Sequence, residues 1–385
     1  MGRTARKAVS ICGMERAFDI IAGKDEKRKG KCMAELVEYL KRAVQDGASD
    51  LFIVAGGKVS EKVEKTLYPI SEENMTPQES ERLITELYVR ANRPIEGYLR
   101  RGDDDFSFSL PGIARFRVNT YHQRGSMAAV VRVVVFEIPD WRKLHIPEQI
   151  MGLAEVSHGM VLVTGTAGSG KSTTQACIID GINRTRGCHI ITLEDPIEFL
   201  HKNQKSIVSQ REIAIDSENY LTALRACLRQ APDVILLGEM RDHETIRTAM
   251  TAAETGHLLI ATLHTKGAVN TIDRIIDSFP GEQQQQIRVQ LSMVLETVIS
   301  QQLLPGINGE LVPAYEIMHI NNAIRSLIRE SKSHQIDNAI AAGSGEGMIS
   351  MDQSILKLYR GGKITRETAL DYAEHPEQLM RRIEG

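Results

Sequence analysis

The residues best suited to chemistry lie in the stretch GTAGSGKST at positions 165–173. Four of them fit the phosphate-binding pattern G-x-x-x-x-G-K-[ST], which joins a strand to a helix: Gly165, Gly170, Lys171 and Ser172. In this pattern, backbone N–H groups and the helix N-terminus point at the β-phosphate of a nucleotide. The lysine reaches the β- and γ-phosphates, and the serine hydroxyl binds Mg2+. A chance glycine-rich turn is the alternative.

We therefore expect ATP and Mg2+ to bind at this loop. The predicted nucleotide contacts cover the loop and the first turn of the following helix: Thr166, Ala167, Gly168, Ser169, Gly170, Lys171, Ser172 and Thr173. Lys171 is also a candidate catalytic residue, because its charge lies where negative charge shifts during phosphoryl transfer.

Two acidic strand ends are candidates for handling Mg2+ and the attacking water. In DVILLGEMRD, Glu239 follows an apolar run, and Gly238 stands where an aspartate usually ends such a strand. In HIITLEDPIEF, Glu194 follows another apolar run. If both strands share one sheet, one carboxylate can hold Mg2+ through water, and the other can orient or deprotonate the attacking water. We assign Glu239 and Ser172 to Mg2+, and the identity of the general base stays open. A structural acidic cap is the alternative for Glu239.

Histidines and cysteines do not indicate a further metal site. His257 and His264 flank the apolar run LLIAT without the spacing of metal ligands, and isolated histidines beside strands are more often structural. The five cysteines form no CxxC pair, and their number is odd. We therefore expect neither a zinc site nor a disulfide framework.

The elements that must position these residues begin near Gly159, where apolar runs start to alternate with helical patterns. The predicted strands are MVLVTG, HIITLEDP, DVILLGE and HLLIATLH. Buried runs separated by helices are typical of an α/β fold with a mainly parallel, doubly wound sheet. Ligands bind such sheets at the carboxyl ends of the strands, where all the motifs above fall. From EQQQQIRVQLSMVLETVISQQLL onward the chain is predicted to be mostly helical, apart from the apolar segment ELVPAYEIM.

A smaller domain precedes this region. MAELVEYLKRAVQDG predicts an amphipathic helix, and SDLFIVAGG predicts a strand. Thr76, Pro77 and Glu79 form a capping box with proline at the first helical position, so a helix should run to about Ala91. ARFRVNTYHQ and MAAVVRVVV, separated by RGS, predict a hairpin.

These patterns divide the chain into four parts. A basic extension that we expect to be flexible covers 1–32, and a small α+β domain covers 33–136. A linker with two prolines covers 137–149. The nucleotide-binding domain covers 150–385, with a helical part from about 282.

Composition bounds the possible functions. A chain of 385 residues exceeds the size that one hydrophobic core usually supports. No run approaches the ~18 apolar residues that span a bilayer, and no secretory signal is visible, so we expect a cytoplasmic protein. A net charge of -3 and 5% aromatic residues argue against direct nucleic-acid binding. Residues 1–31 carry nine Lys/Arg against four Asp/Glu, as a solvated tail or a contact for an anionic membrane or partner would.

Taken together, the motifs resemble the secretion ATPase superfamily, most closely the PilT-like retraction ATPases of type IV pili. The likeness covers about residues 33–375. It is carried by GTAGSGKSTT, ITLEDPIEFLH, QREI with ALRACLRQAPDVILLGEMRD, TIRTAMTAAETGHLLIATLHT and AIRSLIRE. Extension motors and type II secretion ATPases are longer and carry a tetracysteine motif, which this chain lacks. That difference and AIRSLIRE favour the retraction type.

The resemblance implies a RecA-like P-loop domain with a helical C-terminal tail, preceded by a small PAS-like domain. It further implies a homo-hexameric ring that hydrolyses ATP and turns an inner-membrane platform protein during pilus retraction and twitching motility. Such a motor lies in the cytoplasm, peripherally at the inner face of the membrane, and a second pilus motor ATPase can work beside it. Zinc and direct nucleic-acid contacts are not expected.

The resemblance also assigns residue roles. Glu194 takes the place of the acidic-box glutamate, and Glu239 replaces the usual Walker B pair, so a glycine before it is expected. His264 occupies a histidine-box position near the nucleotide. Arg117 and Arg132 match arginines of the N-terminal domain that reach the γ-phosphate.

Two departures from the family pattern stand out. The phosphate loop has Ala167 and no proline where the family usually shows a proline–threonine pair, and SDLFIVAGGKVSEKVEKTLYPI lacks the usual histidine and hairpin pattern. The alternatives to a retraction motor are an accessory nucleotide-binding subunit with little hydrolysis and a nucleic-acid translocase.

Overall fold

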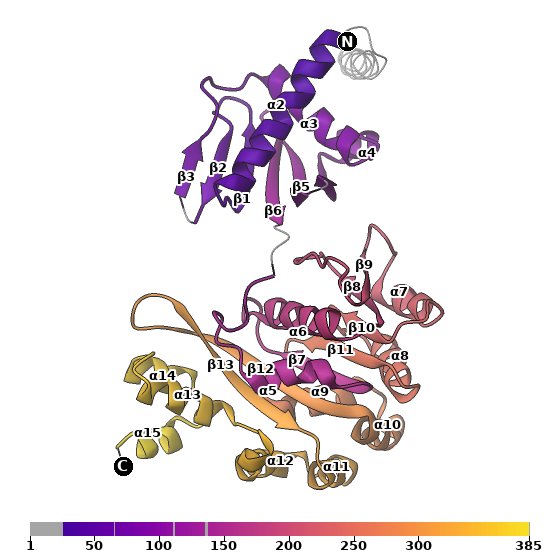
Figure 1. Cartoon of the computed structure of the whole chain (residues 1–385), viewed down its shortest axis with the longest axis vertical. Coiled ribbons are helices and arrows are strands. Elements are labelled where there is room, and N and C mark those ends of the chain that lie inside the picture. Colours follow the sequence, from indigo (N-terminus) through magenta and orange to yellow (C-terminus); the bar gives the residue numbers. More distant parts are fainter. Residues whose placement is uncertain (1–25, 65, 111, 135–137, 385) are drawn as a thin grey trace, which may run out of the picture. The chain divides into compact units, whose positions relative to one another are not determined.

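The computed structural model describes residues 26–64, 66–110, 112–134 and 138–384, with side chains described from residue 35 onward. The chain divides into two compact units, Met1–Phe136 and Glu137–Gly385 (Figure 1). Within the described ranges, no helix combines the length and apolarity needed to cross a bilayer.

The N-terminal unit is built on a six-stranded antiparallel sheet with the order β3-β2-β1-β6-β5-β4. Its strands are β1 (Asp50–Val54), β2 (Ser60–Val63), β3 (Thr66–Pro69), β4 (Asp103–Leu110), β5 (Ala114–Gln123) and β6 (Ser126–Val134). Its helices are α2 (Glu26–Gln45), α3 (Pro77–Arg90) and α4 (Glu96–Arg101). Leu36 and Leu40 of α2, Leu83 of α3, and Phe116 and Val118 of β5 are buried in one cluster, which gives this unit its own core.

Local signals in this unit correspond closely to the structure. Helix α3 begins after Thr76, whose side chain accepts a hydrogen bond from the N–H of Glu79, and the Glu79 carboxylate accepts one from the N–H of Thr76. The capping box is therefore confirmed. Strands β5 and β6 pair through a turn at Arg124 and Gly125, both with positive φ, as the tightest hairpin turns require.

Two features of this unit differ from expectation. Helix α2 begins at Glu26 rather than Met33, so part of the predicted flexible extension is helical, and residues 1–25 lie outside the described ranges. Strands β2 and β3 form a hairpin that the sequence did not reveal. β3 is a short strand that is exposed along its full length and ends in Pro69, features that are typical of a sheet edge.

The second unit contains a seven-stranded sheet with the order β13-β12-β7-β11-β10-β8-β9. All its strand pairs are parallel except β12 with β13, which confirms the predicted α/β class. The strands are β7 (Gly159–Thr164), β8 (His189–Glu194), β9 (Ile207–Glu212), β10 (Val234–Leu237), β11 (Leu258–Leu263), β12 (Leu295–Pro305) and β13 (Leu311–His319). β7, β10 and β11 are buried along their full length, because helices cover both faces.

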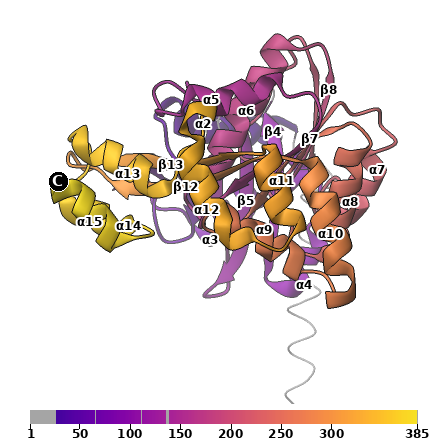
Figure 2. The same cartoon turned by 90° about the horizontal axis from the view of Figure 1, so that it is seen from below.

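Alternate residues of the central strands face the two helix layers. Met160 and Leu162 of β7 pack into the core beneath α7 (Tyr220–Cys227), α8 (His243–Glu254), α9 (Ala268–Asp277), α10 (Gly281–Val294) and α11 (Asn322–Arg329), with α12 (Ile336–Ala342) beside them. Val161 and Val163 face the opposite layer, formed by α5 (Glu148–Met151) and α6 (Lys171–Thr185). Figure 2 shows the two layers on either side of the sheet.

The expectation of continuous helix after Pro280 is wrong in one segment. Helix α10 ends at Val294, and the chain continues directly as β12, which inserts between β7 and β13. Thr297, Val298 and Ile299 are β-branched and buried, so they suit a central strand better than a helix. The predicted apolar segment ELVPAYEIM corresponds to β13.

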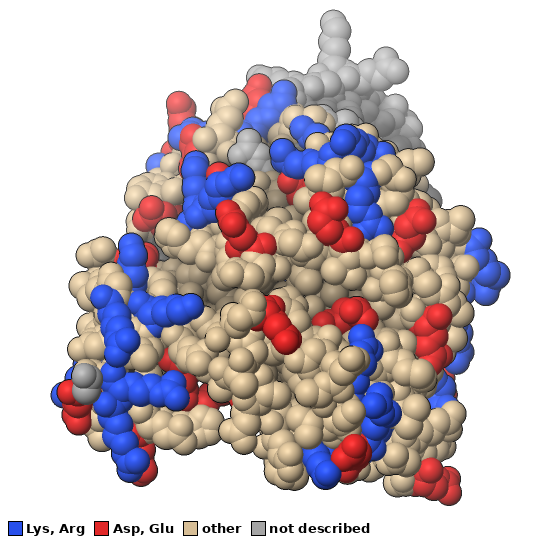
Figure 3. All heavy atoms as spheres, turned by 60° about the horizontal axis from the view of Figure 1, so that its bottom comes forward, with Lys and Arg blue, Asp and Glu red and all other residues tan. Residues whose placement is uncertain are grey.

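A helical tail follows, as predicted, consisting of α13 (Met351–Arg360), α14 (Arg366–Tyr372) and α15 (Pro376–Glu384). It packs on the far ends of β12 and β13 through a small core with Leu304, Val312, Met351, Ile355 and Leu379. Figure 3 shows Lys and Arg side chains gathered over this tail; the exposed ones on α13 and α15 are Lys357, Arg360, Arg381 and Arg382.

Candidate active site

The loop between β7 and α6 has the backbone geometry of a phosphate cradle. Gly165, Gly168 and Gly170 have φ angles of 140°, 75° and 89°, values that side chains strain to adopt. A Cβ atom on Gly165 would lie 2.3 Å from the carbonyl oxygen of Gln301 in β12. The loop therefore needs glycine both for its turns and for its close approach to the neighbouring strand.

The polar groups of this loop are suited to a phosphate. The Lys171 ammonium is buried and donates hydrogen bonds to the carbonyl oxygens of Gly165 and Thr166, at 3.0 and 2.8 Å. Burial lowers the pKa of Lys171, against the opposing effect of the Glu239 charge. The buried Ser169 hydroxyl has no hydrogen-bond partner within the described part of the chain. An anion at the N-terminus of α6 would satisfy these donors.

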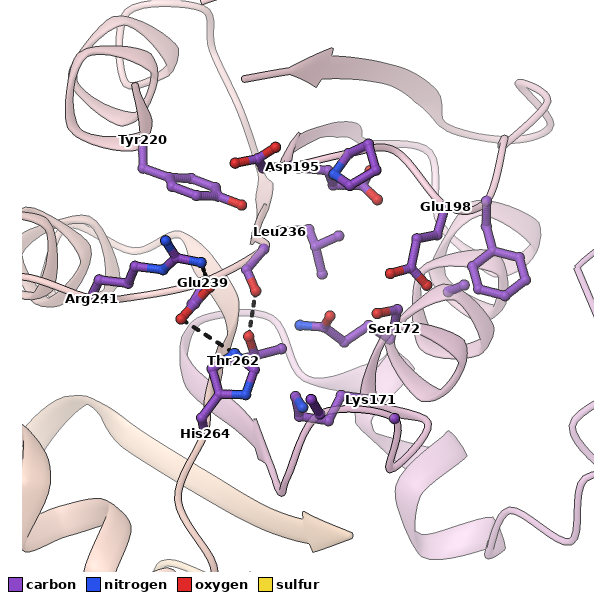
Figure 4. Close-up of a pocket in the computed structure, with 18 of the residues that line it drawn as sticks. Lys171, Ser172, Asp195, Glu198, Tyr220, Leu236, Glu239, Arg241, Thr262 and His264 are labelled. Atoms are coloured by element: carbon purple, nitrogen blue, oxygen red, sulfur yellow. Dashed lines mark hydrogen bonds and ion pairs between the residues drawn. The ribbon is translucent and has the colours of Figure 1, made fainter. Parts of the chain in front are cut away.

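The other predicted loop contacts surround this cradle. Thr166, Ala167 and Gly168 are exposed at the tip of the loop, whereas Ser172 and Thr173 are half-buried in the first turn of α6. Ser172 lines the adjacent cavity, which has a volume of about 320 Å³ (Figure 4).

The same cavity brings the predicted carboxylates together. Glu194 ends β8, Glu239 follows β10 and His264 follows β11. Because β8, β10 and β11 are adjacent and parallel, their carboxyl ends meet at one edge of the sheet, and all three side chains line the cavity with Lys171.

Glu194 has an environment that favours its neutral form. Protein surrounds the carboxyl, and this burial raises its pKa to about 7, although hydrogen bonds oppose the shift. Its Oε1 accepts one from the Thr192 hydroxyl at 2.6 Å and one from Gln210 Nε2 at 3.2 Å. A carboxyl that titrates near neutral pH is suited to exchange a proton with water.

Glu239 has the opposite electrostatic environment. Burial alone would raise its pKa, but an ion pair with Arg241 at 2.7 Å and a contact with His264 Nε2 at 3.3 Å lower it. Glu239 is therefore ionised. Together with the Ser172 hydroxyl on the same cavity, it offers the oxygen ligands that Mg2+ prefers, so these two residues fit the metal.

Gly238 is explained by packing. Its N–H donates to the carbonyl oxygen of Leu193, and a Cβ atom there would lie 2.8 Å from the Tyr220 hydroxyl and 3.0 Å from the same carbonyl. A side chain at this position would force Tyr220 or one of the two strands to shift. The first carboxylate after β10 is consequently that of Glu239.

Three other residues named in the sequence analysis belong to other parts of the fold. His257 precedes β11, at the opposite end of the strand from His264, and its Nδ1 lies 2.9 Å from the carbonyl oxygen of Ala252. Arg117 and Arg132 belong to the N-terminal unit. They are cross-strand neighbours in β5 and β6, paired with the carboxylates of Asp105 and Asp50 at 2.8 and 3.0 Å.

The cavity also contains polar side chains that sequence reasoning did not single out: Glu198, His201, Tyr220 and Arg241. Gln210, beside it on β9, also contacts Glu194. Most of these residues lie inside the motifs ITLEDPIEFLH, QREI and GEMRD. Their position in these motifs could therefore have identified them as candidate site residues. Their contacts with Glu194 and Glu239 depend on strand packing and could not be read from the sequence.

Comparison with known proteins agrees with this geometry. Residues 25–343 match the family described as type II/IV secretion system protein. The type IV pilus retraction ATPase PilT of Pseudomonas aeruginosa is 43% identical over 349 residues, covering 90% of this chain and all of the relative. The type IV pilus ATPase PilU of the same organism is 36% identical over 350 residues, covering 91% of each chain.

The fold is shared as well. A crystal structure of the pilus retraction motor PilT with bound ADP superimposes with a TM-score of 0.82 at 44% identity, covering 89% of this chain and 98% of that one. The phosphate loop, the two glutamates and this likeness over nearly the full length lead to one conclusion. The chain is an ATPase that belongs to the type II/IV secretion system protein family, among its PilT-like members.

Proposed function

We propose that this chain is a motor that hydrolyses ATP to power retraction of type IV pili. The observation that carries the proposal is the convergence of Lys171, Glu194 and Glu239 on one cavity beside the phosphate loop. The retraction role is supported by the PilT relative, which the chain matches over that protein's whole length.

We assign the chemistry as follows. Ser172 and, through water, Glu239 would hold a bound Mg2+, which would supply positive charge near the β- and γ-phosphate oxygens. Lys171 exchanges its bonds to the loop carbonyls for bonds to these oxygens. Glu194 orients the attacking water and accepts its proton, while His264 holds the Glu239 carboxylate in place.

Arg117 and Arg132 complete the site in this proposal. Each would leave its aspartate partner and bring a guanidinium to the γ-phosphate, in its own subunit or in a neighbour within a homo-hexameric ring. An arginine that acts in this way changes the hydrolysis rate by ~10³ to 10⁵. The α+β domain (33–136) and the linker (137–149) would carry this movement.

We place the motor in the cytoplasm, at the inner face of the membrane, where it turns a platform protein and a second pilus motor ATPase can join it. The exposed cations on α13 and α15 support a contact with an anionic surface there. The PilU relative supports the existence of paired motors in this family.

The test is phosphate release by the purified full-length chain. We expect steady ATP hydrolysis that falls by about 10² or more in Lys171→Ala and Glu239→Ala, because each removes transition-state charge stabilisation. Arg100→Ala, an exposed change on α4, serves as the control. Normal turnover by both variants would refute the assigned site. A chain that binds ATP but releases no phosphate would be an accessory subunit, and stimulation by DNA would indicate a translocase.

Retraction itself is tested in the host. Deletion of the gene should leave excess pili that do not shorten, counted by electron and fluorescence microscopy. Loss of pili would instead identify an extension motor.

A further inference from the structure

We infer that Gln210 is a positioning residue for hydrolysis: its amide holds the Glu194 carboxyl and the loop of residues 195–201, here called the acidic-box loop, in one arrangement. The inference rests on the proposed role of Glu194. Gln210 lies on β9, at the edge of the sheet, and is part of no contact with the phosphate loop that the structure describes.

The amide of Gln210 uses both of its ends. Nε2 donates hydrogen bonds to Glu194 Oε1 at 3.2 Å and to the carbonyl oxygen of Phe199 at 2.8 Å, and Oε1 accepts one from the N–H of His201 at 2.8 Å. A primary amide has two N–H donors and one carbonyl acceptor. The reversed orientation would place the amide oxygen against a carboxyl oxygen and a carbonyl, so the network fixes the orientation shown.

Strand register explains why position 210 can do this. β8 and β9 are parallel, and Thr192 is the direct neighbour of Gln210 across the pair. The two side chains lie on the same side of the sheet and donate to the same oxygen of Glu194. A carboxyl held by two donors from adjacent strands loses the freedom to rotate away from the cavity.

The acidic-box loop is the second part of the arrangement. Glu198, Phe199 and His201 of this loop line the cavity, and Gln210 bonds the backbone of two of them. The charge of Glu198 raises the pKa of Glu194, and the backbone N–H of Glu198 lowers it. The placement of the loop therefore sets how readily Glu194 gives up its proton.

The decisive variant is Gln210→Met, which keeps the length and removes all three hydrogen bonds. Because the variant removes a hydrogen bond to the ionised carboxylate of Glu194, kcat should fall about tenfold or more. The acid limb of the kcat–pH profile should move up by about one pH unit, since Glu194 loses a donor to its ionised form. Affinity for fluorescent ADP should stay within about twofold, because Gln210 does not contact the phosphate loop.

The control is Gln204→Met, the same change at an exposed glutamine whose side chain bonds Asp180 instead. The other titratable groups that face the cavity are unchanged in both variants: Lys171, Asp195, Glu198, His201, Tyr220, Glu239, Arg241 and His264. A shift of the acid limb of the kcat–pH profile that occurs only in Gln210→Met therefore arises from a change in the titration of Glu194.

A second variant guards against simple loss of folding. Gln210→Glu keeps an acceptor but sets a second carboxyl beside Glu194, so the acid limb should move further than in Gln210→Met. Identical profiles for Gln210→Met and Gln204→Met would overturn the inference, as would a joint loss of ADP binding and thermal stability with an unmoved pH profile. Full activity of Glu194→Gln would instead remove the proposed role of Glu194.

Discussion

Two glutamates at neighbouring strand ends carry the chemistry of this molecule in opposite electrostatic states. Burial raises the pKa of Glu194 to about 7, whereas Arg241 and His264 keep the Glu239 carboxyl ionised. Environments that separate the pKa values of two carboxyls in one site usually separate their roles. This contrast supports Glu194 as the general base and Glu239 as the permanent anion beside Mg2+, a choice that the sequence left open.

The raised pKa of Glu194 predicts a pH-dependent gain in stability for Glu194→Gln. Between pH 4.5 and about 7, the folded chain binds this proton more tightly than the unfolded chain does. The stability associated with the neutral carboxyl is therefore complete below pH 4.5 and is lost as pH rises through 7. Glutamine avoids that loss, so the variant should exceed the wild type by up to ~3 kcal/mol at pH 8 and match it near pH 4.5.

Urea unfolding at both pH values measures this difference. Glu377→Gln, on the exposed face of α15, should show no such pH dependence and serves as the control. If the Glu194→Gln variant were less stable than the wild type at pH 8, the claim that burial of the ionised Glu194 carboxylate costs stability would be wrong.

At the scale of elements, the contact between β8 and β10 depends on a missing side chain. Gly238→Ala would press a methyl group against the Tyr220 hydroxyl and the Leu193 carbonyl. Overpacking of this kind costs about 1–3 kcal/mol, and it should also displace Glu239 and reduce ATP hydrolysis. Gly281→Ala, at an open position in the first turn of α10, should change neither quantity.

Thermal melting and phosphate release check this prediction together. The double variant Gly238→Ala with Tyr220→Phe should recover part of the stability, because it removes one of the two obstructing atoms. Equal melting temperatures for Gly238→Ala and the wild type would show that the strands can separate at no cost.

Elements with strong local signals could be predicted from the sequence, and those decided by tertiary packing could not. The capping box at Thr76 and Glu79 and the buried runs of β7, β10 and β11 are visible in short windows. β12 was predicted as helix, because its Leu, Glu and Gln residues also suit a helix and its partner β7 lies far away in the chain. The choice between helix and strand for this segment depends on whether it can pair with the edge of β7, which the sequence of the segment does not show.

The same division holds for the site. Gly165, Lys171 and the two glutamates follow from motifs with a physical reason for each residue type. The hydrogen bond from Gln210 to Glu194 and the packing of Tyr220 against Gly238 depend on which strands are adjacent in the sheet. A short sequence motif does not give that order. His257 directly precedes β11 and His264 directly follows it, and the structure shows that only the end with His264 borders the cavity.

At the scale of the whole molecule, the proposed motor needs both units. Arg117→Ala and Arg132→Ala should each lower kcat by ~10³ or more while leaving ADP affinity nearly unchanged, because an arginine finger acts mainly on the transition state. Arg100→Ala provides the matched control within the same unit. Wild-type turnover by both variants would show that hydrolysis proceeds without help from the N-terminal unit.

The close contact between Gly165 and Gln301 has a mechanical consequence. The Gln301 side chain also accepts a hydrogen bond from the Thr174 hydroxyl at 2.8 Å, so β12 lies close to the start of the phosphate loop and is bonded to the first turn of α6. The same strand continues to Leu304, inside the core of the C-terminal tail. We therefore expect a displacement of the phosphate loop to move β12, which is hydrogen-bonded to β7 and β13, and with it the tail helices α13, α14 and α15.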